Sequence, residues 1–272
     1  MEHNDIVVGT DGGAGGAWAV RWAASQAART GARLRVVSVH HRQPGTPTGP
    51  DVSGRERAWA VVTAAVADAR GGRPTLDVRG SALPGAPGDV LLAEARSAAL
   101  LVVGSQGRGA LASALPGSVG VHVATYATGP VAVVRGRADT AIGTVVAGIA
   151  DPAAAERVLA AGFEEAHRRG CALVAVRAPT PPRTPVEASS AGLGTLVRAD
   201  VSETVTRLRT LFPTVPVEVE LTAGNPADVL VAASRSAQLV VLDAGPAPSL
   251  GPVNHHLLLR ADCPVLLLRD TL

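Results

Sequence analysis

A glycine-rich segment in the first half of the chain has the residue types that bind phosphate groups. Two residues separate Gly104 from Gly107, and nine separate Gly107 from Gly117, which directly precedes Ser118. Glycine lets a backbone approach a phosphate closely, and the free N–H groups at the start of a helix attract negative charge. The segment therefore predicts a phosphate site, to which Ser118 adds a hydroxyl donor and Arg108 a positive charge.

The basic residues of the chain limit which kinds of phosphate-binding site are possible. All 25 are arginine, so a lysine-dependent phosphate loop, a Schiff-base lysine and a kinase of the usual type are excluded. The formal net charge is only +2, and no basic run carries interleaved aromatic residues, so we expect no nucleic-acid partner. Residues 1–140 hold 14 arginines against 10 acidic residues, and the remainder holds 11 against 13. This difference favours an anionic ligand in the first half.

Cysteine usage and hydropathy indicate the compartment. The two cysteines, Cys171 and Cys263, form neither a C-x-x-C pair nor a metal-ligand spacing, which suits a reducing environment. No apolar run reaches the roughly 20 residues that cross a bilayer, and the residues after Met1 are polar. We therefore expect a cytoplasmic protein without a membrane span.

An internal repeat organises the chain. An offset of 139 residues places Gly9 on Gly148 and Leu34 on Leu173. The same offset aligns further pairs, namely Pro87 with Pro226, Asp89 with Asp228, and Leu91 with Leu230. The register slips by five residues before Pro130, which matches Pro264. The repeat predicts two copies of one domain, at residues 1–138 and 139–272.

Each copy alternates short β-branched runs with helical patterns, an order typical of parallel strands joined by helical crossovers. In the first copy we expect strands at 6–8, 34–39, 76–78, 100–103 and 131–134. Between them we expect helices near 18–28, 57–69, 89–98 and 119–125. In the second copy we expect strands at 145–146, 173–176, 217–221, 239–242 and 265–268. The predicted fold class is α/β, with two tandem open five-stranded parallel sheets of the doubly wound, Rossmann-like type. In such sheets ligands bind at the carboxyl ends of the strands, which would bring Asp11 beside the glycine-rich segment.

The motif Gly104-x2-Gly107-x9-Gly117-Ser118, together with residues 8–13, resembles the universal stress protein family. The resemblance covers the whole first copy and implies an ATP-binding domain, often with a divalent cation such as Mg²⁺ at the phosphates. It implies that the phosphates rest on the four motif residues and Val119, and that Asp11 and the backbone near Val39 hold the adenosine. It also implies that the two copies mimic the dimer of single-domain members.

The second copy departs from this motif. Asp243 replaces Gly104, Ala150 replaces Asp11 and Pro252 replaces Ser118. A carboxylate at Asp243 would repel a phosphate, and proline lacks the N–H donor. We expect that this copy does not bind ATP in the usual way, although Asp151 could stand in for Asp11.

The sequence leaves three functions open. The first is a regulatory, ATP-binding stress-response protein that acts on an unidentified protein partner, with a homodimer left open. The second is a metal-assisted ATP hydrolase or nucleotidyl-transfer enzyme, although no nucleophile or general base can be assembled from the sequence. The third is a nucleotide-free interaction module. A dinucleotide fingerprint at residues 107–112 is disfavoured because it follows the fourth strand of the copy instead of the first.

Overall fold

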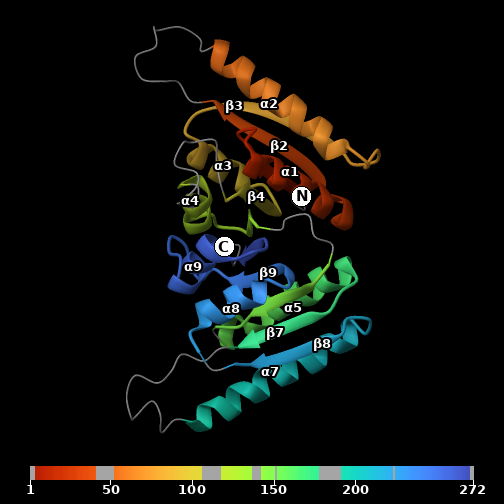
Figure 1. The fold of residues 1–272 in the computed structure, drawn as a ribbon, viewed down its shortest axis with the longest axis vertical. Coiled ribbons are helices and arrows are strands. Elements are labelled where there is room, and N and C mark those ends of the chain that lie inside the picture. The colour runs from red at the N-terminus through yellow and green to blue at the C-terminus, as the bar shows by residue number, and fades with distance from the viewer. Residues whose placement is uncertain are drawn as a thin grey trace. The chain divides into compact units, whose positions relative to one another are not determined.

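The computed structural model describes residues 4–40, 52–105, 118–136, 142–150, 152–177, 191–222 and 224–269. They form two compact units (Figure 1). The first unit comprises Met1–Asp139 with the short segments Ala244–Leu250 and Arg269–Leu272. The second comprises Thr140–Asp243 and Gly251–Leu268.

The first unit is built on a parallel sheet with the strand order β3-β2-β1-β4-β5. The order reverses between β1 and β4, and this reversal creates the crevice in which open α/β sheets bind ligands. Valine and leucine dominate β1, β4 and β5, whose residues are almost all buried, as expected for strands covered on both faces. The strands are β1 (Asp5–Gly9), β2 (Arg33–His40), β3 (Val78–Pro84), β4 (Leu100–Gly104) and β5 (Val131–Val134).

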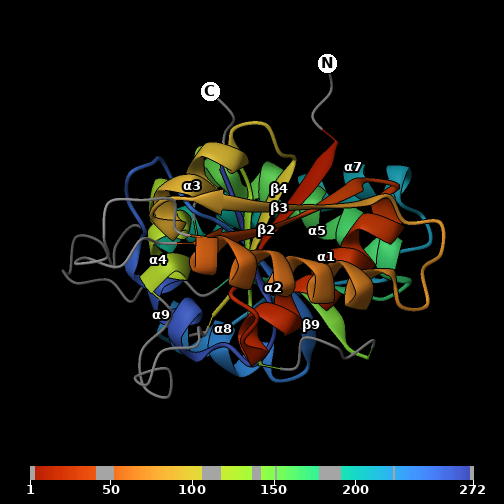
Figure 2. The same ribbon diagram turned by 90° about the horizontal axis from the view of Figure 1, so that it is seen from above.

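Four helices cover the two faces of this sheet. The helix α1 packs on α2, and α3 packs on α4. Figure 2 shows α1 and α2 on one side of β2 and β3 and α3 on the other, as right-handed crossovers from this strand order require. The helices are α1 (Ala14–Thr30), α2 (Val52–Arg70), α3 (Pro87–Ala95) and α4 (Ser118–Tyr126).

The second unit repeats this arrangement with the strand order β10-β9-β6-β7-β8, again all parallel. Its strands are β6 (Thr144–Gly148), β7 (Leu173–Arg177), β8 (Val217–Leu221), β9 (Ala237–Asp243) and β10 (Val265–Leu268). Its helices are α5 (Pro152–Arg169), α7 (Ala191–Leu211), α8 (Pro226–Ser234) and α9 (Pro252–Arg260). The predicted fold class, two tandem doubly wound five-stranded parallel sheets, is confirmed.

Two predicted elements of the first copy were misplaced. The third strand is Val78–Pro84 instead of 76–78, because Gly80 and Pro84, which resemble turn residues, both lie within it. A Cβ at Gly80 would overlap Cγ1 of Val62, so glycine is what lets α2 pack on this strand. Pro84 is tolerated because β3 is an edge strand. The third helix ends at Ala95, with Arg96 as its C-cap, instead of continuing to residue 98.

Small aliphatic side chains fill the interior. Fully buried valines, leucines and alanines from the strands and the facing helices make up most of the core of both units, including Val7, Val8, Leu101, Val145 and Leu239. Among the described helices, none combines the length and the apolar character needed to cross a bilayer.

Candidate functional site

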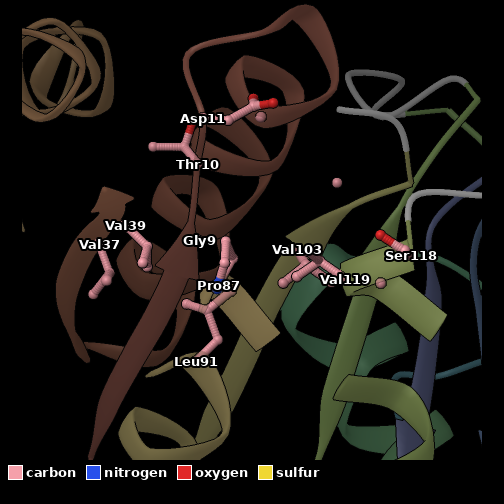
Figure 3. A pocket seen from close by; sticks show the side chains of 13 residues that line it. Gly9, Thr10, Asp11, Val37, Val39, Pro87, Leu91, Val103, Ser118 and Val119 are labelled. Carbon is pink, nitrogen blue, oxygen red and sulfur yellow. The ribbon is translucent and has the colours of Figure 1, made fainter. Parts of the chain in front are cut away.

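The carboxyl ends of β1, β2 and β4 and the start of α4 surround a cavity in the first unit (Figure 3). Its volume is about 230 Å³. The described residues that line it are Gly9, Thr10, Asp11, Gly16, Val37, Val39, Pro87, Leu91, Val103, Gly104, Ser118, Val119 and Gly120. The cavity therefore lies at the reversal of strand order, where the doubly wound fold favours a ligand.

One half of the cavity is apolar. Val37 and Val39 come from β2, Pro87 and Leu91 from α3, and Val103 from β4. Figure 3 shows Leu91, Pro87 and Val37 on the same side of the opening, away from Ser118. This surface offers no charge, and it suits a flat, uncharged group such as a nucleobase.

Glycines at the strand ends let neighbouring elements approach closely. A Cβ placed on Gly104 would lie 2.5 Å from the carbonyl oxygen of Gly15, so no other residue fits where β4 ends against the start of α1. A Cβ on Gly9 would lie 2.7 Å from Cδ1 of Leu91, which is the contact that joins β1 to α3. Gly104 is restricted to glycine by backbone, whereas a larger residue at Gly9 would have to displace the Leu91 side chain, and both glycines line the cavity.

The turn after β1 places polar side chains at the rim. Asp11 is exposed, and its Oδ1 accepts a hydrogen bond of 2.8 Å from the N–H of Gly13. Thr10 is buried, and its Oγ1 accepts a bond of 3.1 Å from the N–H of Gly12. Gly12 has a φ of 75°, in the left-handed region that glycine adopts without strain. These contacts hold the Asp11 carboxylate in a defined position at the opening.

The helix α4 begins at the opposite side of the opening. Ser118 is its first residue and is exposed, and Val119 follows it in the cavity lining. The first four N–H groups of a helix have no partner within the helix and carry the positive end of its dipole. Figure 3 shows Ser118 across the opening from Asp11. An anion at this mouth would meet backbone donors and the Ser118 hydroxyl.

The sequence-predicted site residues divide into two groups. Asp11, Val39, Gly104, Ser118 and Val119 all line this one cavity. The remaining three, Gly107, Arg108 and Gly117, lie outside the described residues.

Several lining residues were not predicted from the sequence as site residues. They are Gly9, Thr10, Gly16, Val37, Pro87, Leu91, Val103 and Gly120. The repeat contained a signal for some of them, because Gly9, Pro87 and Leu91 are identical to the residues 139 positions later. Identity between diverged copies marks positions where packing restricts the choice of residue.

The site has a single carboxylate among its described lining residues, that of Asp11. Within the described part of the chain, no group of three His, Cys, Asp or Glu residues could hold a metal ion. The protein side of the described site could therefore contribute one carboxylate to a cation held mainly by other ligands.

A cavity of about 220 Å³ occupies the equivalent place in the second unit. Gly148, Val176, Pro226 and Leu230 line it at the positions of Gly9, Val37, Pro87 and Leu91. The apolar half of the cavity is therefore present in both units.

The other half of the second cavity has changed. Asp243, which ends β9, is bound by Nη2 of Arg157 from α5 at 2.5 Å, and its carbonyl oxygen accepts a 2.9 Å bond from Nδ2 of Asn254. The sequence predicted that the Asp243 carboxylate would repel phosphate, and this stays a prediction. The structure adds that this carboxylate forms an ion pair with Arg157, which the sequence did not predict.

Comparisons with known proteins agree with this architecture. The model of the universal stress protein family matches residues 3–135 and again residues 142–269. The chain is 30% identical to universal stress protein Rv2005c of Mycobacterium tuberculosis over 99% of this chain and 98% of that protein. A universal stress protein of Mycolicibacterium smegmatis is 31% identical over 97% and 96%. A crystal structure of a universal stress protein from Archaeoglobus fulgidus superposes with a TM-score of 0.73 at 15% identity, covering 99% of both chains, which shows a shared fold.

Proposed function

The chain belongs to the universal stress protein family, and from this premise we propose that its first domain binds ATP and that the protein is a regulatory, nucleotide-responsive stress protein. The observation that carries the proposal is that one cavity has an apolar half and, across its opening, the start of a helix. The cavity suits the base, and the first turn of α4 suits the phosphates. The two ends of a nucleotide thus find matching chemistry within one site.

Individual residues have distinct tasks in this proposal. Val37, Val39 and Leu91 would exclude water from the faces of the base. Asp11, oriented by Gly13, would accept a hydrogen bond from the sugar. The N–H groups of the first turn of α4 and the Ser118 hydroxyl would donate to phosphate oxygens.

A divalent cation would be a secondary ligand. Mg²⁺ is usually bound through one or two carboxylates together with substrate phosphates and water. Asp11 is the described carboxylate at the mouth, and this fits a cation held chiefly by the nucleotide. We propose that Mg²⁺ neutralises phosphate charge in this site.

The proposal extends to the organisation of the chain. Residues 1–138 would be the ATP-binding domain, and residues 139–272 a degenerate partner that mimics the second subunit of a dimer. ATP would act by favouring one conformation that an unidentified protein partner recognises, and this requires different ATP affinities in the two conformations. Cys171 and Cys263 form no disulfide, which suits work in the reducing cytoplasm.

A matched pair of variants tests the ATP site. Ser118 and Pro252 are equivalent, exposed first residues of α4 and α9. Ser118→Trp should weaken ATP binding at least about tenfold, or about 1.4 kcal/mol, because the indole covers the donors at the mouth. Pro252→Trp should bind ATP like the unmodified protein. Calorimetric titration with Mg-ATP measures both, and equal ATP affinity in the two variants would count against the proposal.

A further inference from the structure

The cavity of the second unit has no assigned ligand. Its lining residues come from β6, β7, β9, α8 and α9 and from the turns next to them. Its volume, about 220 Å³, is close to the 230 Å³ of the first cavity. We propose that it binds an uncharged purine, as the free base or the nucleoside, and does not accept the phosphorylated form.

The surface that would receive a base is retained. Gly148 ends β6 as Gly9 ends β1, and a Cβ on Gly148 would overlap the side chain of Leu242. The N–H of Ile149 donates 2.9 Å to the carbonyl oxygen of Val176, as that of Thr10 does to Val37. Leu230 from α8 completes the apolar wall. The same backbone geometry therefore holds the same kind of apolar slot open.

The mouth of the second cavity has fewer donors for a phosphate and carries an added carboxylate. Pro252 begins α9 and has no N–H to donate, whereas Ser118 at the start of α4 has both a backbone N–H and a hydroxyl that can donate. Asp243 brings a carboxylate to the end of β9, and Arg157 already holds it in an ion pair. A phosphate would meet an occupied arginine and a carboxylate of its own sign, so charge selects against nucleotides here.

A polar group remains for recognition of an uncharged ligand. Asn254 lines the cavity and is 8% exposed. Its Nδ2 donates to the backbone of Asp243, and its Oδ1 has no hydrogen-bond partner within the described residues. A carboxamide oxygen accepts from N–H or O–H groups. The exocyclic amine of adenine or a ribose hydroxyl is a donor of this kind, which explains the choice of a purine over a purely aliphatic ligand.

Adenosine is the probe, with the first cavity saturated by ATP. Equilibrium dialysis of labelled adenosine against the full chain should find one molecule per chain with excess ATP present. Ala150→Trp should abolish this binding, because Ala150 is an exposed residue of the cavity rim where a large side chain blocks entry without entering the core. Asn254→Leu should weaken it at least about fivefold through the loss of the acceptor.

Asp11→Trp is the matched control, since Asp11 is the exposed equivalent of Ala150 in the first cavity. The Asp11→Trp variant should lose ATP binding in the first cavity and retain adenosine binding in the second. Absence of adenosine binding in the presence of ATP would overturn the proposal, as would binding that Asp11→Trp removes and Ala150→Trp leaves intact. If ATP fails to bind at all, the proposed function is wrong. The effect of Ala150→Trp on adenosine binding then still shows whether the second cavity binds adenosine.

Discussion

The two cavities share an apolar half and differ in the half that faces the last helix of each unit. Gly9, Pro87 and Leu91 of the first cavity have identical counterparts in the second, whereas Gly104 is replaced by Asp243 and Ser118 by Pro252. The shared residues pack β1 and β6 against α3 and α8, so changing them would disturb the core. The differing residues lie where the fourth strand of each unit ends and where its last helix begins. Divergence of the two copies has therefore changed the residues at these positions while leaving the scaffold intact.

The largest expected effect comes from converting the first cavity toward the second. Gly104→Asp introduces both a Cβ that lies 2.5 Å from the Gly15 carbonyl oxygen and a charge of the same sign as phosphate. We expect overpacking to cost about 1–3 kcal/mol of stability and ATP binding to disappear. Thermal unfolding and calorimetric titration measure the two effects.

Gly104→Asn separates the two causes, because asparagine has the same shape without the charge. It should destabilise the protein equally but bind ATP at least about tenfold better than the aspartate variant, or about 1.4 kcal/mol. Identical ATP affinities would mean that shape alone distinguishes the cavities and that the charge at this strand end is irrelevant.

A smaller effect is expected in the second unit. Arg157→Met removes the partner of Asp243, and the two side chains are 33% and 22% exposed. The exposure of this pair is intermediate between that of a surface salt bridge and that of a buried one. We therefore expect the free energy of unfolding to fall by about 1–2 kcal/mol. Hydrogen exchange should rise in peptides from α5 and β9 and stay unchanged in the first unit. Faster exchange in β1 and β4 would show that the units are not independent in stability.

The smallest effect concerns an ion pair that only the first copy has. Arg33 and Asp77 correspond to Ala172 and Pro216 in the second copy. The hydrogen bond from Arg33 lowers the pKa of Asp77 below its ordinary 3.8. The pair therefore stabilises the fold above that value and is lost as the pH falls below it.

Asp77→Asn should make exchange in β2 and β3 less sensitive to acid, by a small amount because both side chains are exposed. The measurement is peptide-resolved hydrogen exchange from pH 5 down to about pH 3, with β7 and β8 as the internal reference. If the acid dependence of exchange in β2 and β3 is the same in the variant, the Arg33–Asp77 pair does not contribute to acid stability.

The sequence allowed much of the fold to be predicted, because the repeat doubled the signal for each strand. Residues that act through local backbone geometry, such as Gly104 and Ser118, could also be found, since glycine spacing and helix starts are local patterns. The third strand was misplaced because Gly80 and Pro84 have turn-like residue types, and their place in an edge strand depends on α2 packing over them.

The balance of charge in the second cavity could not be predicted. Asp243 and Arg157 are 86 positions apart in the chain, and only the fold brings the end of β9 to α5. For the same reason the apolar wall of the first cavity was missed: Val37 and Leu91 resemble ordinary core residues until β2 and α3 are placed beside β1.

The most direct test of the difference between the cavities is the number of ATP molecules bound per chain. Native mass spectrometry of the full chain with saturating Mg-ATP should find one, reduced to none by Ser118→Trp and unchanged by Pro252→Trp. Two ATP molecules per chain, or none on the unmodified protein, would contradict the account.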